Sequence, residues 1–243
     1  MTPTLDLDGL RLYPGAHNPG DRMCVMEAVA WVAGEPWSDQ PECASGVIGA
    51  FLRTWNDGMD DDDRQMLVPL IPRLVGTAAS ERVERARSFL ALDWLVRTFT
   101  PAWLRLAGLT DHADTLAALP ELTSAEHADA AVPVIRAART AAGAAAGDAA
   151  RTAAGAAAGA AAGAAAGDAA GAARAAAGAA AGAAARAAAW AAAWDAAWDA
   201  TRDAAWDAAR DVAATALRPT VIELQRSALA LVDQMIQLAE VPA

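Results

Sequence analysis

The chain has 243 residues and a formal net charge of −11, enough length for one well-filled domain and an appendage. The acidity lies before residue 131, where 20 Asp and Glu face 10 Arg, whereas the remainder carries ten acidic residues against nine Arg. Without a basic stripe to displace counterions, the sequence argues against nucleic acid as a partner. Two cysteines are too few for a disulfide framework, and no secretory signal is evident, so we expect a cytoplasmic protein.

Helical periodicity begins after an irregular leader at residues 1–20, which is rich in Pro, Gly and Asn. Asp21 is a good N-cap for a first helix, and Gly34 would end that helix. A second helix is predicted over residues 42–55. Its apolar residues recur at helical spacing: Val47, Ile48, Phe51, Leu52 and Trp55.

An acidic run, Asp60 to Asp63, precedes the next apolar segment. Carboxylates at a helix N-terminus cap free amides and complement the helix dipole, so we interpret the run as capping. A calcium loop would need alternating ligands, a central Gly and a terminal Glu, none of which this run has. Pro69 and Pro72 should kink or split the helix that follows.

Ser80 opens the most apolar helix, which has hydrophobic residues nearly all round and is therefore expected at the centre of a bundle. Its core positions include Phe89, Leu92, Trp94, Val96 and Phe99. Asp93 and Arg97 stand four apart and should pair along the helix, as a partly exposed structural ion pair. A shorter helix around Trp103 should end at Gly108. The helical domain is thus predicted to span residues 21–122.

A capping box of Thr123 and Glu126 would start a second region, an Ala-rich helical arm over residues 123–218. Within it a four-residue repeat recurs. One position of the repeat is Gly, Arg or Trp, which we call the mark, and the other three are mostly Ala. The marks are Arg139, Gly143, Gly147, Arg151, Gly155, Gly159, Gly163, Gly167 and Gly171, then Arg174, Gly178, Gly182, Arg186, Trp190, Trp194, Trp198, Arg202, Trp206 and Arg210. Pro219 starts an amphipathic C-terminal helix over residues 219–243, which must either return to the domain or dimerise.

The repeat has two interpretations that the sequence leaves open. Gly, Arg and Trp codons can differ in the first base alone, so slippage of a twelve-base unit could have produced a neutral expansion. Alternatively the repeat is a selected surface, with small residues allowing close helix approach and Trp offering a contact area. Its apolar runs are too short and too weakly hydrophobic for a membrane span. Whether the arm is one rod or bends back also stays open.

The segment from Met23 through Cys24, Glu27 and Gly34 to Cys43 resembles a group of uncharacterised proteins from actinobacteria and their phages. The resemblance covers roughly residues 10–120. Because no activity is assigned to that group, it implies no functional residues.

The best chemical constellation in the sequence lies in this same segment. His17, Cys24, Glu27 and Cys43 are weak candidates for a metal site, since two thiolates with a His or a carboxylate would suit zinc. The spacing lacks a Cys-x-x-Cys pair, however, and a Cys on an apolar helix face is usually buried packing. We therefore expect two thiols, no metal and no cofactor.

These observations favour an all-α protein: a compact helical bundle, then the Ala/Gly-rich arm, then the amphipathic helix. We expect a non-enzymatic interaction or scaffold protein, with a protein partner or a second copy of the chain. Its interaction surface is predicted at Trp190, Trp194, Trp198 and Trp206. The alternative is an enzyme or a small-ligand or metal-binding protein with a site near Cys24, Glu27 and Asp39.

The bundle should also fold without the arm, because its helices carry their own caps and apolar faces. Residues 1–130 are long enough to form a core by themselves. We therefore expect a chain that ends after Ala130 to unfold cooperatively.

Overall fold

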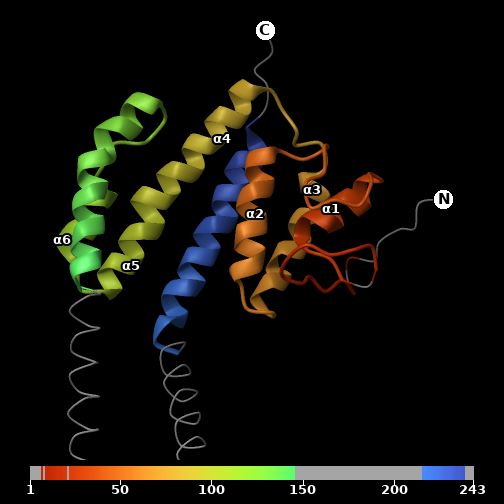
Figure 1. The fold of residues 1–243 in the computed structure, drawn as a ribbon, viewed down its shortest axis with the longest axis horizontal. Coiled ribbons are helices and arrows are strands. Elements are labelled where there is room, and N and C mark those ends of the chain that lie inside the picture. The colour runs from red at the N-terminus through yellow and green to blue at the C-terminus, as the bar shows by residue number, and fades with distance from the viewer. Residues whose placement is uncertain (1–6, 8, 21, 146–214, 239–243) are drawn as a thin grey trace, which may run out of the picture.

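The protein is described from a computed structural model, which places residues 7, 9–20, 22–145 and 215–238. Helices dominate these ranges, and no strand occurs among them (Figure 1). The expectation of an all-α fold is confirmed. No helix within the described ranges is long and apolar enough to cross a membrane.

The helices follow one another with short connections. They are α1 (Val25–Ala33), α2 (Gly46–Gly58), the 3₁₀ helix η1 (Asp63–Leu70), α3 (Ile71–Leu74), α4 (Glu81–Trp94), the π-helical turn η2 (Leu95–Phe99), α5 (Thr100–Leu106) and α6 (Thr110–Ala117). Two further helices cover residues 125–145 and 215–237. Because α4, η2 and α5 are contiguous, they form one long helix with a π-turn inside it.

The first two helices begin later than predicted. The backbone N–H of Cys24 donates to the Glu27 carboxylate at 2.7 Å, so Cys24 is the N-cap of α1. Gly34 ends α1 in the left-handed conformation at φ 73°, as expected.

For α2, the N-cap is Ser45, whose hydroxyl accepts from Ile48 N at 3.2 Å. The backbone N–H groups of Glu42 and Cys43 instead donate to the Glu35 carboxylate, each at 2.7 Å. Those bonds hold the segment before Ser45 as a loop.

The acidic run lies at a helix N-terminus as predicted, since Asp63 stands in the first turn of η1, but the predicted capping bond is not made. Asp62 precedes η1 but its side chain makes no capping bond. Asp61 instead accepts from the buried Arg64 at 2.6 Å, and Asp63 binds Arg218 of the last helix. The carboxylates are thus drawn to guanidinium groups, which offer stronger, charge-assisted bonds than helix amides. The prediction for Pro69 and Pro72 is confirmed, since the segment divides into η1 and α3.

The helix that starts after Ser80 is also confirmed, and it joins two packing units. Asp93 and Arg97 pair at 3.0 Å as predicted, and Asp93 also accepts from the backbone N–H of Leu122 at 2.8 Å. The following helix is capped by Ser124, whose hydroxyl accepts from His127 N at 3.2 Å, and not by Thr123. The Thr123 hydroxyl instead lies 3.1 Å from Nδ1 of the His127 ring and pairs with that nitrogen.

Two hydrophobic clusters fill the molecule. The larger lies among α1, α2, η1, α3 and the 215–237 helix, with Val25, Val29, Ile48, Leu52, Leu67, Ile71, Leu74 and Val232 among its buried members. The smaller joins η2, α5 and α6 to the 125–145 helix through Val96, Leu104, Ala113, Leu116, Leu122, Ala131 and Ala138. The long α4–η2–α5 helix runs between them (Figure 1).

The apolar face of the last helix packs on the N-terminal domain. Of the two predicted alternatives, return to the domain or dimerisation, the structure shows the first. Leu231, Val232 and Met235 are buried in the larger cluster. The larger cluster therefore extends beyond residues 1–130, and cooperative unfolding of a chain that ends after Ala130 stays a prediction. Sequence spacing showed that this helix needs a partner, but it could not show that the partner lies some 150 residues earlier in the chain.

A buried arginine fixes the end of this helix. Arg87 in α4 is 2% exposed, and its guanidinium donates to the carbonyls of Met235 at 2.9 Å and Leu238 at 3.0 Å. It also donates to Thr77 O at 2.7 Å and to the Glu84 carboxylate at 2.6 Å. The last carbonyls of a helix lack intrahelical partners, so a cation here satisfies them and complements the helix dipole.

We predict that Arg87→Met lowers the free energy of unfolding by about 3–5 kcal/mol, because it removes the ion pair with Glu84 and leaves the carbonyls of Thr77, Met235 and Leu238 without this donor. Urea titration followed by circular dichroism measures this. The matched control is Arg85→Met on the same helix, which loses only an exposed pair with Glu81 and should change stability by less than about 1 kcal/mol. Equal effects of the two substitutions would contradict the role given to Arg87.

Candidate functional site

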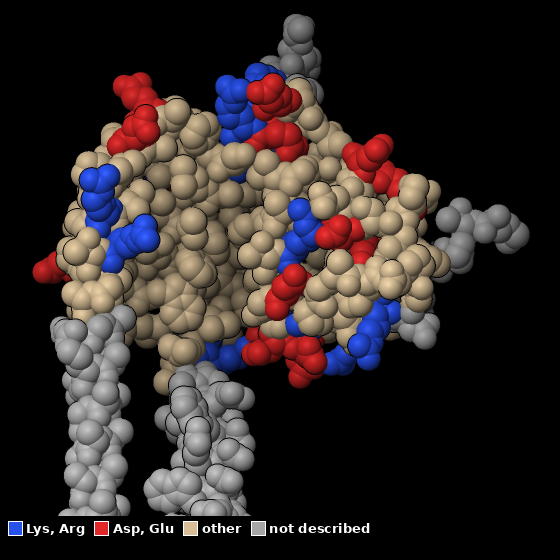
Figure 2. Space-filling view, in the orientation of Figure 1, with Lys and Arg blue, Asp and Glu red and all other residues tan. Residues whose placement is uncertain are grey.

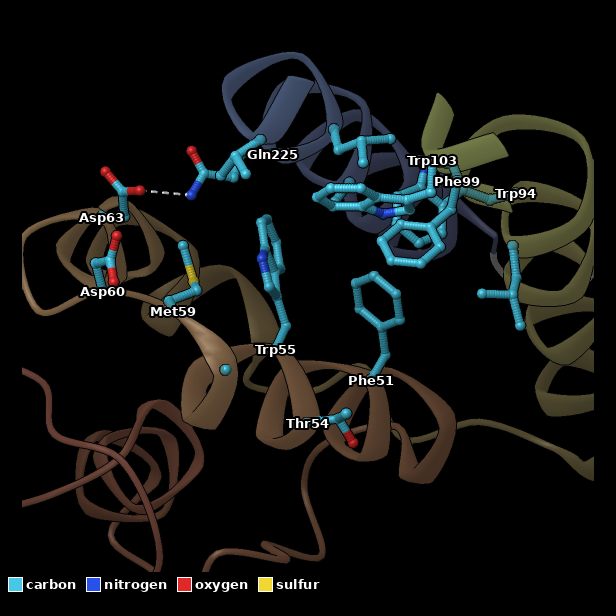
Figure 3. Close-up of a pocket in the computed structure, with 15 residues that line it drawn as sticks. Phe51, Thr54, Trp55, Met59, Asp60, Asp63, Trp94, Phe99, Trp103 and Gln225 are labelled. Atoms are coloured by element: carbon cyan, nitrogen blue, oxygen red, sulfur yellow. Dashed lines mark hydrogen bonds between the residues drawn. The ribbon is translucent and has the colours of Figure 1, made fainter. Parts of the chain in front are cut away.

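An aromatic cavity of about 710 Å³ lies where α2, the α4–η2–α5 helix and the 215–237 helix meet (Figure 3). Its aromatic lining consists of Phe51, Trp55, Trp94, Phe99 and Trp103, and aliphatic lining comes from Met59, Leu95, Val221, Leu224 and Ala228. The polar groups that line it are Thr54, Asp60, Asp63 and Gln225, with Gly58 beside them. The cavity is thus mostly apolar and has a few polar groups.

The rings form a connected series. Phe51 lies 5.8 Å from Trp55 and 5.7 Å from Trp94 between ring centroids, the latter nearly perpendicular at 83°. Trp94 lies 5.2 Å from Phe99, which lies 6.1 Å from Trp103. Such offset and edge-to-face contacts are the favourable arrangements for aromatic pairs, so the wall is ordered by its own packing.

Helical spacing places these rings on common faces. Phe51 and Trp55 are four apart on α2, and Phe99 and Trp103 are four apart across η2 and α5, so each pair projects from one side of its helix. The indole N–H of Trp94 donates to the Ser227 hydroxyl at 2.9 Å, which ties the aromatic wall to the last helix. All five rings remain only half-buried.

One end of the cavity is acidic. Asp63 is bound there by Arg218 and by the Gln225 amide at 2.7 Å. The hydrogen bonds from Arg218 hold the pKa of Asp63 below its usual value, against the opposing effect of burial. Figure 3 shows Asp60 and Asp63 at this end, with Trp55 standing between them and the other rings.

The face of the molecule shown in Figure 2 has no charged side chains at its centre. Figure 2 shows a hollowed area without acidic or basic side chains between the 125–145 helix and α2, with both kinds of charge around its rim. In Figure 1 this is the region that α4, α5 and the 215–237 helix occupy. The surface therefore offers apolar contact bordered by charge.

Three of the four metal candidates come together away from this cavity. Glu27 is 1% exposed and its carboxylate accepts from His17 N at 2.5 Å, and from Cys24 N at 2.7 Å. His17 Nδ1 lies 2.9 Å from the same carboxylate. Trp37 in turn donates its indole N–H to His17 O at 2.7 Å. The Glu27 carboxylate is thus saturated with donors, and its role is to fasten the leader onto α1.

The ionisation of these groups supports a structural role. Burial would raise the pKa of Glu27, but the donors from Cys24 and His17 outweigh it and lower that pKa below its usual value. Burial raises the pKa of Cys24 to about 12, so its thiol stays protonated at neutral pH. Because the thiolate is the form that binds metals and attacks substrates, the raised pKa makes Cys24 a poor ligand and a poor nucleophile.

The remaining candidates lie elsewhere. Burial and the neighbouring Glu35 raise the pKa of Cys43, which does not join the His17 cluster. Asp39 pairs with Arg53 at 3.8 Å. Within the described residues, no group of three or more His, Cys, Asp or Glu side chains has an arrangement that could hold a metal ion.

The predicted interaction surface at Trp190, Trp194, Trp198 and Trp206 lies outside the described residues. The aromatic cavity, in contrast, was not predicted as a site. Its aromatic residues were recognised as apolar positions of predicted helices, but helical spacing alone cannot distinguish a filled interface between helices from one that leaves a hollow.

Comparisons with known proteins returned no matching family model, no matching curated protein and no matching solved structure.

We predict that Glu27→Gln lowers the free energy of unfolding by about 2–4 kcal/mol at neutral pH, because charge-assisted hydrogen bonds are lost at a buried position. The folded pKa of Glu27 is depressed, so its contribution is present above the ordinary value of 4.5 and is lost as pH falls through the folded value. The difference between parent and variant should therefore shrink on acidification. Urea titrations across acidic pH test this, with the exposed Glu81→Gln as control. A difference that does not change with pH would contradict it.

Proposed function

We propose that this protein is a non-enzymatic interaction or scaffold protein in which the helical body displays the Ala-rich repeat as an arm anchored at both ends. The observation that supports this is the return of the 215–237 helix to the core. Residues 146–214 are therefore an insertion between two helices of one body, rather than a free tail. In Figure 1 the described part of the chain stops before this insertion and resumes after it at the same edge of the body, at the bottom of the view.

Each anchor has its own contacts. The 125–145 helix buries Ala131 and Ala138 against η2, α5 and α6. The 215–237 helix is held by Arg87 at its end and by the pairing of Arg218 with Asp63 at its start. The two helices that flank residues 146–214 are thus each fixed to the body, which supports a display role for the segment between them.

We assign the contact surface of the arm to Trp190, Trp194, Trp198 and Trp206. Tryptophans are enriched among the residues that dominate binding energies at protein interfaces. Arg and Asp nearly balance beyond residue 130, which favours a protein partner or a second copy over nucleic acid. With two thiols and no disulfide framework, the proposal places this activity in the cytoplasm.

The alternative, an enzyme or ligand site near Cys24, Glu27 and Asp39, has less support. The Glu27 carboxylate is occupied by backbone and ring donors, and the Cys24 thiol is protonated. Asp39 faces Arg53 rather than either of them. These three groups therefore do not form a nucleophile with a base.

We predict that replacing the four arm tryptophans with Ala abolishes assembly or partner binding while leaving the body folded. Native mass spectrometry of the chain purified from its own host reports bound proteins and copy number together. The matched control replaces Arg174, Arg186, Arg202 and Arg210, which occupy equivalent marks of the repeat, and should retain the parental assembly. A parent chain that is a bare monomer, or a tryptophan variant that assembles as the parent does, would instead indicate a neutral expansion.

A further inference from the structure

We propose that the aromatic cavity binds a small organic cation, an amine or ammonium compound with an apolar body. This goes beyond the display role proposed for the arm and rests on different residues. The argument uses the size of the cavity, the chemistry of its walls and the charge at one end.

The size fits a small molecule. Ligand pockets in proteins typically measure about 300–1,000 Å³ and have mostly hydrophobic and aromatic walls with a few polar groups. This cavity measures about 710 Å³, and its lining comes from α2, the start of η1 and the loop before it, the α4–η2–α5 helix and the 215–237 helix. The ring contacts and the Trp94–Ser227 hydrogen bond hold the wall in place before any ligand binds.

The walls favour a positive charge. Aromatic faces carry negative electrostatic potential and attract ammonium groups, most strongly when the face belongs to Trp. Three of the five rings that line the cavity are Trp: Trp55, Trp94 and Trp103. The ammonium group of such a ligand would be attracted to the Trp faces, and its apolar body would be buried against the apolar walls.

The end of the cavity adds a carboxylate that is available to such a ligand. Asp63 is engaged by Arg218 and Gln225, whereas Asp60 makes no hydrogen bond or ion pair through its side chain with any described residue. Asp60 does act electrostatically on Arg218. Asp61, Asp62 and Asp63 are paired with Arg64, Arg11 and Arg218, so Asp60 carries the uncompensated charge among these four carboxylates and disfavours an anion.

Three probes of one shape separate the possible ligand classes: 1-naphthylmethylamine, 1-naphthalenemethanol and 1-naphthoate. Isothermal titration calorimetry with the full chain should show saturable binding in the order amine, then alcohol, then carboxylate. Asp60→Asn should weaken amine binding about two- to fivefold and leave alcohol binding unchanged, since an exposed charge contributes modestly. The matched control is Asp62→Asn, which removes a neighbouring charge that does not line the cavity and should have a smaller effect.

A second variant tests the wall. Trp103→Leu removes a ring while keeping apolar bulk, and should weaken binding of both the amine and the alcohol about two- to tenfold. Absence of saturable binding by the full chain would overturn the proposal. So would equal affinity for the three probes, or equal effects of Asp60→Asn and Asp62→Asn on the amine.

Discussion

The fold depends on how one buried guanidinium joins two distant parts of the chain. Arg87 in α4 donates to carbonyls at the end of the 215–237 helix, across a sequence separation of 148 residues to Met235. A buried arginine is costly unless its donors are satisfied, and here Thr77 O and Glu84 take the remaining directions. The same bonds satisfy carbonyls that the helix itself leaves without partners. The Arg87 guanidinium therefore needs these carbonyls as acceptors, and the carbonyls need Arg87 as a donor.

Two consequences follow from this closure. The larger hydrophobic cluster includes Leu231, Val232 and Met235, so the body is complete only when the chain has passed through the repeat and returned. The same helix supplies Val221, Leu224 and Ala228 to the aromatic cavity. The cavity and the larger cluster thus depend on the packing of the same helix.

The parts of the fold that depend on local patterns could be predicted from the sequence. Spacing and backbone chemistry predict the all-α class, the end of α1 at Gly34, the division of the helix between Pro69 and Pro72, and the Asp93–Arg97 pair. Predictions of hydrogen-bond partners failed where a residue distant in sequence offered a side chain a stronger partner. Asp63 could cap a helix, but Arg218 offers a charged partner some 155 residues away. Similarly, the cluster of His17, Cys24 and Glu27 was recognised, but only the structure shows that backbone donors fill the carboxylate.

The central claim is that the 215–237 helix is a full member of the body's core rather than an appendage resting on it. Native-state hydrogen exchange, followed residue by residue, tests this most directly because it measures the opening free energy of each segment. The account predicts that the amides of Leu231 and Val232 exchange only with global unfolding, at the same free energy as the core amides of α1 and α2. Exchange of these two amides at a much lower free energy, while α1 and α2 stay protected, would contradict it.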